Sequence, residues 1–224
     1  MWQVETMACS GVLISMGTLA GCLAVSSIGP SVQVAAGRGP VKPVPVPKKT
    51  YMDPEGGVSF QYPAIWTFSR DASSYFSRVI VSEGEPLQAV LSFSPKGNYY
   101  EHTTLTALEF LYRRKPTPTR QACEALLLDN SGDGDAPAPL TIHGVTYAHL
   151  HTGDAGMMKS VDQDGYAAWR GGMCYLFEGD LTEISLGVDG EKNRALTNRE
   201  HRVLERHMSD VMQSVQFTPP AKGQ

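Results

Sequence analysis

The sequence is poor in positive charge and lacks the short motifs that mark common enzyme classes. Lysine and arginine number 19 against 23 acidic residues, which leaves a formal net charge of -4. A chain with this balance has no broad positive field with which to hold nucleic acid. It also has no Gly-x-Ser-x-Gly, no His-Glu-x-x-His and no phosphate-binding glycine loop. We therefore expect neither a nucleic-acid-binding protein nor an enzyme, and we assign no cofactor.

Charge is missing altogether from residues 7–25, which are apolar and rich in small side chains. Such a run fits the core of an export signal, although the residues before it lack the usual Lys or Arg. The run contains Leu19-Ala20-Gly21-Cys22, which resembles the lipobox of bacterial lipoproteins. The resemblance implies a signal peptide over residues 1–21 and a lipid on Cys22, whose acyl chains anchor the protein in a membrane.

Two other interpretations of this leader remain open. Cleavage after Val34-Ala35-Ala36 would release a soluble exported protein, and an uncleaved helix of about 20 residues would span the bilayer. All three interpretations export the rest of the chain. We expect it on the periplasmic side of a bacterial cell envelope, attached to the membrane through the lipid.

Proline, absent from the leader, is frequent in the segment that follows. Pro40, Pro43, Pro45 and Pro47 nearly alternate with valine and lysine. This composition disfavours helix and favours extended polyproline II, which acts as a semi-rigid spacer. We assign residues 22–50 to a proline-rich tether, residues 51–218 to one globular domain and residues 219–224 to a tail.

Alternating apolar and polar residues dominate the domain. Val58, Phe60 and Tyr62 share one face of a predicted half-buried strand. Further strands are predicted at 78–82, 89–94, 141–151, 157–161, 166–170, 173–178 and 181–188, with tight turns at 162–165 and 171–172. Helices are predicted at 104–115, at 119–128 and after Thr197, which forms a capping box with Glu200. Because strands and helices are segregated, the fold class is α+β, an antiparallel sheet flanked by helices.

Two segments carry a resemblance to a known family. The stretch GGVSFQYPAIW, residues 56–66, is similar to the opening of PsbP/Mog-type domains, and VMQSVQF, residues 211–217, is similar to their close. The resemblance implies an α/β/α sandwich that serves as a binding or assembly module without enzymatic activity. Ligand and partner residues vary within the family, so none is carried over.

The predicted function is therefore that of an exported, lipid-anchored, non-enzymatic envelope protein. Its partners are the membrane and an envelope protein or small ligand. The first alternative is a periplasmic metal-binding carrier that uses a histidine cluster, and the second is a hydrolase.

Cys123 and Cys174 are the cysteines of the predicted domain. An even pair in an exported protein favours a disulfide, which would stabilise the fold by about 4 kcal/mol through loop closure. A nucleophilic cysteine activated by a histidine and a pair of buried free thiols are the alternatives. No recognisable catalytic signature surrounds either cysteine.

Three further features are candidate sites. His143, His149 and His151 alternate along one predicted strand, so they could hold zinc or copper, or form a hydrogen-bonded polar edge. Residues 129–135 place oxygen ligands as in a calcium loop, but the twelfth position lacks glutamate, which favours a polar connection. Trp169 and Arg170 are residue types enriched at interfaces and predict a partner-binding patch, unless they serve the adjacent hairpin. Trp66 is expected in the core.

Overall fold

The computed structural model describes residues 46–70, 87–128, 136–156, 158–186 and 193–218. The chain divides into two compact units, Met1–Pro43 and Val44–Gln224, and every described element lies in the second. Several predicted features lie outside the described residues: the lipobox at Cys22, most of the tether, the strand at 78–82, the calcium-like loop at 129–135 and the tail at 219–224.

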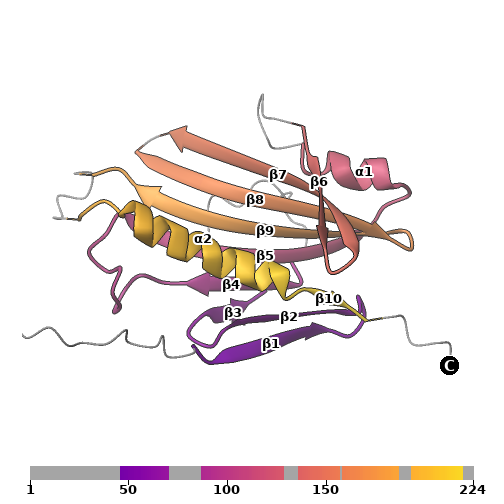
Figure 1. Cartoon of the computed structure of the whole chain (residues 1–224), viewed down its shortest axis with the longest axis horizontal. Helices are drawn as coiled ribbons and strands as arrows, with labels where there is room; N and C mark the ends of the chain where they lie inside the picture. The colour runs from indigo at the N-terminus through magenta and orange to yellow at the C-terminus, as the bar shows by residue number, and fades with distance from the viewer. Residues whose placement is uncertain (1–45, 71–86, 129–135, 157, 187–192, 219–224) are drawn as a thin grey trace, which may run out of the picture. The chain divides into compact units, whose positions relative to one another are not determined.

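A seven-stranded antiparallel sheet forms the centre of the second unit, in the order β3-β4-β5-β9-β8-β7-β6 (Figure 1). Its strands are β3 Thr67–Ser69, β4 Ala89–Phe93, β5 Leu105–Pro116, β6 Ala138–Ile142, β7 Val145–Gly156, β8 Lys159–Arg170 and β9 Met173–Ile184. A smaller sheet has the order β1-β2-β10, with β1 Lys48–Asp53, β2 Val58–Pro63 and β10 Gln216–Phe217. Strand β1 begins within the segment predicted as tether, ahead of residue 51.

Helices α1 (Arg120–Ala125) and α2 (Asn198–Gln213) cover opposite faces of the large sheet. Neighbouring residues of β5 show this, because Phe110 packs in the core with Leu204 of α2, whereas Leu111 packs in the core with Cys123 of α1. The smaller sheet joins α2 on its face, where Phe60 contacts Phe110 ring to ring. The predicted α+β class, an antiparallel sheet flanked by helices, is confirmed.

The helix predicted over residues 104–115 is wrong, because this segment is strand β5. It lies between β4 and β9 and is buried on both faces, Leu108 on the α2 side and Leu111 on the α1 side. A strand covered on both faces carries apolar residues at consecutive positions, and such a run also satisfies the helical period. The helix predicted after Thr197 is confirmed, including both hydrogen bonds of its capping box with Glu200.

Strands β8 and β9 are longer than predicted. The turn expected at 162–165 is wrong, because these residues lie within β8, paired to β7 and β9. The turn at Gly171 and Gly172 is confirmed, with positive φ at both glycines joining Arg170 to Met173. The two short strands predicted at 157–161 and 166–170 are therefore the single strand β8, and those predicted at 173–178 and 181–188 correspond to β9.

The predicted disulfide is present between Cys123 of α1 and Cys174 of β9. Both cysteines are fully buried in the core on the α1 side. Trp66 is also buried, at 3% exposure, in the core on the α2 side. The described part of the chain contains no helix that is long and apolar enough to cross a membrane.

Candidate functional site

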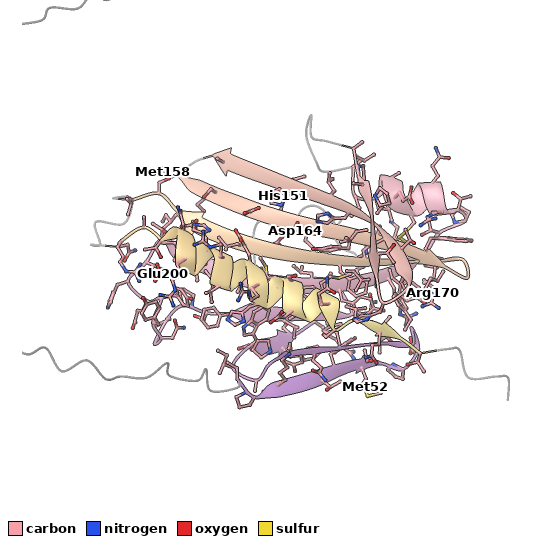
Figure 2. All side chains as sticks on the ribbon, in the orientation of Figure 1. Met52, His151, Met158, Asp164, Arg170 and Glu200 are labelled. Atoms are coloured by element: carbon pink, nitrogen blue, oxygen red, sulfur yellow. A yellow bond between two sulfur atoms is a disulfide. The ribbon has the colours of Figure 1, made fainter. Side chains whose placement is uncertain are left out.

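One part of the large sheet, on the α2 side, carries polar titratable side chains in place of apolar ones. They are His149 and His151 of β7 and Asp162 and Asp164 of β8, hereafter the His–Asp cluster. Strand register brings them together, because His151 pairs directly with Asp164. Helix α2 packs mainly on β2, β5 and β9, and Figure 2 labels His151 and Asp164 on the neighbouring strands β7 and β8.

Both imidazoles of the His–Asp cluster converge on one carboxylate oxygen. Nε2 of His149 lies 2.8 Å from Oδ1 of Asp164, and Nδ1 of His151 lies 3.2 Å from the same oxygen. The other ring nitrogen of His151, Nε2, lies 3.3 Å from Oδ1 of Asp162. The His149 ring also stacks on Tyr166, with ring centroids 4.7 Å apart. Hydrogen bonds and stacking therefore fix the side chains before any ligand arrives.

The two carboxylates of the His–Asp cluster differ in their electrostatic surroundings. Burial alone would raise the pKa of Asp164, but its hydrogen bond to His149 and the nearby charges of His149 and His151 lower it overall. At Asp162 burial is the dominant influence and raises the pKa, against the opposing attraction of His151. Asp164 is therefore the more firmly ionised carboxylate of the pair.

A second histidine–carboxylate contact borders the cluster where α2 meets β9. Nε2 of His201 lies 2.8 Å from Oε1 of Glu183, and the other oxygen of Glu183 accepts a hydrogen bond from the Thr104 hydroxyl. Within the described residues, no hydroxyl or thiol hydrogen-bonds His149 or His151. The cluster thus holds hydrogen-bonding and charged groups.

His143 does not join the other two histidines of the predicted metal set. Residues 141–151 form two strands, and His143 sits in the turn between them with Gly144, both at positive φ. Its Nε2 donates to the Gln213 carbonyl, 2.6 Å away at the end of α2. Among the described residues, no group of three or more His, Cys, Asp or Glu side chains is arranged to hold a metal ion.

Trp169 and Arg170 lie at the end of β8, beside the glycine turn. Nε1 of Trp169 donates to the Thr117 carbonyl at 2.9 Å, and the side chain is 37% exposed. The Arg170 guanidinium lies over the Phe217 ring, 4.5 Å from its centroid. Both residues therefore support the hairpin, and about a third of Trp169 remains open to a partner.

The α1 side of the sheet contains buried carboxyl groups that the sequence pattern does not indicate. Asp180 of β9 is 2% exposed, and its Oδ1 accepts from Nε2 of Gln163 at 3.1 Å. Burial and the neighbouring charge of Glu178 hold the pKa of Asp180 well above its usual range. Glu178 and Asp180 alternate along β9, and in a sequence such alternation indicates a solvent-facing side. Only the packing of the sheet reveals that this side is covered.

A hollow of about 240 Å³ lies between α1 and the β6–β7 hairpin. Its walls include Arg120, Glu124, Pro139 and Ala148. Pockets for small molecules usually have volumes of about 300 Å³ or more. Arg120 and Glu124 already pair with each other, 2.9 Å apart. The His–Asp cluster is therefore the better candidate site.

Comparison with known proteins gives similarity only at the level of structure. No family model matches the chain, and no curated protein matches it. Cyanobacterial PsbP from Synechocystis sp. PCC 6803 is similar at 13% identity and a TM-score of 0.43, covering 81% of this chain and 99% of that one.

Two other solved structures are similar. LpqN of Mycobacterium tuberculosis, described as involved in cell envelope biogenesis, has 12% identity and a TM-score of 0.35, with coverage of 77% of this chain and 86% of that one. A protein from Bacteroides thetaiotaomicron has 11% identity and a TM-score of 0.42, with coverage of 76% of this chain. The chain spans only 48% of the Bacteroides protein's length.

Proposed function

We propose that the chain is an exported, lipid-anchored, non-enzymatic accessory protein of the bacterial envelope that binds a partner protein or small ligand. The observation that carries the exported location is the buried disulfide between Cys123 and Cys174. Disulfides form and persist in oxidising compartments and are rare in the cytosol. The apolar leader that precedes Cys22 supports the same location.

The lipid anchor is tested by metabolic labelling of the full chain with radioactive palmitate. Cys22→Ala is expected to abolish the label, because the lipobox resemblance places the acyl chains on this thiol. Cys9→Ala is the matched control, since Cys9 lies in the same leader ahead of the lipobox and should leave labelling intact. Equal labelling of wild type and Cys22→Ala would contradict the anchor.

We place ligand or partner binding at the His–Asp cluster. Its side chains combine partial exposure, from 27% for His149 to 61% for His151, with fixed positions. Fixed polar groups bind a partner at a smaller entropic cost than mobile ones. Trp169 and Arg170 supply a second candidate contact, through the exposed part of the indole.

The binding site is tested by crosslinking in intact cells followed by purification of the anchored protein. The double variant His149→Ala/His151→Ala is expected to lose the crosslinked partner that wild type retains. His102→Ala is the control, because His102 is an exposed histidine in the turn before β5, outside the His–Asp cluster. An unchanged crosslinking pattern in the double variant would show that the partner binds outside the His–Asp cluster. Trp169→Ala would then test the second candidate contact.

A further inference from the structure

The exposed side of α2 carries arginines along its length. Arg199, Arg202 and Arg206 are all exposed and follow the spacing i, i+3 and i+7, which places them on one helix face. The opposite face is buried in the core and consists of Leu204, Met208, Val211 and Met212. We call the three arginines the arginine ridge.

The arginine ridge is not explained by ion pairing within the domain. Among the described residues no ion pair includes Arg199, Arg202 or Arg206, although Glu205 and Asp210 are exposed on the same helix. Glu200, in the first turn, is paired with Arg194 from outside the helix. The ridge therefore presents three arginines that no ion pair within the described residues neutralises, next to exposed Glu205 and Asp210.

Helix stability does not explain the ridge either. Arg199 and Arg202 lie in the first turns of α2, where the positive end of the helix dipole disfavours cations. Arg202 and Arg206 are like charges at i and i+4, which also disfavours the helix. Glu205, three residues after Arg202, and Asp210, four residues after Arg206, offset part of this repulsion. Arg199 has no acidic residue at these spacings along α2, so helix stability does not account for the whole ridge. The remaining positive charge points to an external anion.

The surroundings favour an extended anionic surface as that partner. The chain as a whole carries a net charge of -4, so the ridge is a local exception to an acidic protein. Val203, 37% exposed on the same helix, adds an apolar contact near the ridge. In Figure 1, β1, the first strand of the domain, and α2 both begin at the same end of the domain.

We propose that the arginine ridge docks α2 against the anionic headgroups of the bilayer to which the chain is anchored. This inference rests on the proposed lipid anchor. The residues between Cys22 and β1, at a reach of up to about 3.3 Å each, supply enough chain for the ridge to contact the same bilayer. Each basic residue close to an anionic membrane strengthens binding about fivefold, so three arginines contribute about a hundredfold.

The test uses the isolated unit Val44–Gln224, which contains every described strand and helix, both cores and the disulfide, and is expected to fold alone. Vesicles of phosphatidylcholine, with or without one-third phosphatidylglycerol, are floated with the protein. Wild type is expected to float only with the anionic vesicles and to be released by high salt. R199Q/R202Q/R206Q is expected to weaken this binding about a hundredfold.

The matched control is R70Q/K96Q/R120Q, which removes the same charge from exposed residues outside α2 and β1 and is expected to keep anionic vesicle binding. Circular dichroism verifies that every variant is folded. Equal flotation with neutral vesicles, absence of flotation, or equal loss in the control would each overturn the proposal. Loss of a protein crosslink in the ridge variant without any lipid binding would assign the ridge to an acidic protein. Because this unit lacks Cys22, the result is independent of the palmitate experiment.

Discussion

At the scale of single residues, Asp53 connects the two sheets. Its Oδ1 accepts from the backbone N–H groups of Glu55 and Gly56 at 3.1 and 3.0 Å. Its Oδ2 accepts from the Tyr112 hydroxyl and from Nε of Arg114, each at 2.9 Å. Asp53 is only 6% exposed, so one buried carboxylate fixes the β1–β2 turn and attaches it to β5.

Asp53→Ala is expected to lower the free energy of unfolding by about 3 kcal/mol, because it leaves the partly buried Arg114 without its charged partner and Tyr112 without its acceptor. Glu55→Gln is the control. The Glu55 side chain pairs with the same arginine but is 81% exposed, and such pairs contribute less than about 1 kcal/mol. Urea denaturation measures the free energy of unfolding of both variants. Equal losses of stability in Asp53→Ala and Glu55→Gln would contradict the role assigned to Asp53.

Asp180 should make stability depend on pH. Burial and the charge of Glu178 raise its pKa in the folded state. A raised folded pKa gives stability that is complete below the unfolded pKa and is lost as pH rises through the folded value. Asp180→Asn removes that loss of stability. The free energy of unfolding of the variant should therefore exceed that of wild type by about 1 kcal/mol or more at pH 8, and the difference should shrink toward pH 4.

Thermal unfolding across this pH range measures the Asp180→Asn effect. Asp210→Asn is the control, since it makes the same substitution at an exposed position near the end of α2, where no buried carboxyl group is removed. A variant that is less stable than wild type at every pH would show that the Asp180 carboxylate is satisfied in its ionised form.

At the scale of elements, the contact between α2 and β9 depends on a missing side chain. A Cβ added to Gly179 would lie 3.0 Å from Sδ and 3.4 Å from Cβ of Met208. Gly179→Ala is therefore expected to push the helix outward and to cost about 1–3 kcal/mol through overpacking. Gly153→Ala is the control, because the nearest atom to its added Cβ is 3.8 Å away. Equal melting temperatures for the two variants would refute this packing argument.

The sequence predicts elements that alternate or carry a cap and fails where burial removes the pattern. Strand β2 and helix α2 are predicted because Phe60 and Leu204 repeat with their neighbours at the period of one buried face. Strand β5 is mistaken for a helix because both of its faces are covered, and Leu111 faces away from Phe110. The period of apolar residues in a sequence reflects which face of an element is exposed. A strand that is buried on both faces therefore lacks the alternation that identifies a strand.

The sequence predicts two members of the candidate site and misses the cross-strand partner. His149 and His151 share a face as their spacing indicates, but the third member is Asp164 of the next strand and not His143. The sequence pattern predicts a strand interior at His143 and Gly144, where the structure has a short turn with both residues at positive φ. Cross-strand partners such as Asp164 depend on register, which a single sequence specifies weakly.

At the scale of the whole molecule, the two cores are separate clusters on opposite faces of one sheet. The core on the α1 side contains the smaller set of apolar residues, including Leu127 and Leu176, and the disulfide lies within it. Cys123 is on the short helix α1 and Cys174 is on the long strand β9. The covalent bond therefore attaches the thinner layer of the domain to its central sheet.

Removal of this bond should destabilise the entire domain without changing its fold. The cysteines are 51 residues apart, and loop closure of that length contributes about 4 kcal/mol in the chain-entropy model. Urea denaturation of Val44–Gln224 carrying Cys123→Ser/Cys174→Ser should therefore show a lower midpoint. The free energy of unfolding should fall more steeply with urea concentration, because the unfolded chain without a crosslink exposes more surface. Wild type in strong reductant is the control and should approach the double variant. A midpoint unchanged in both would mean that apolar packing alone holds α1 on the sheet.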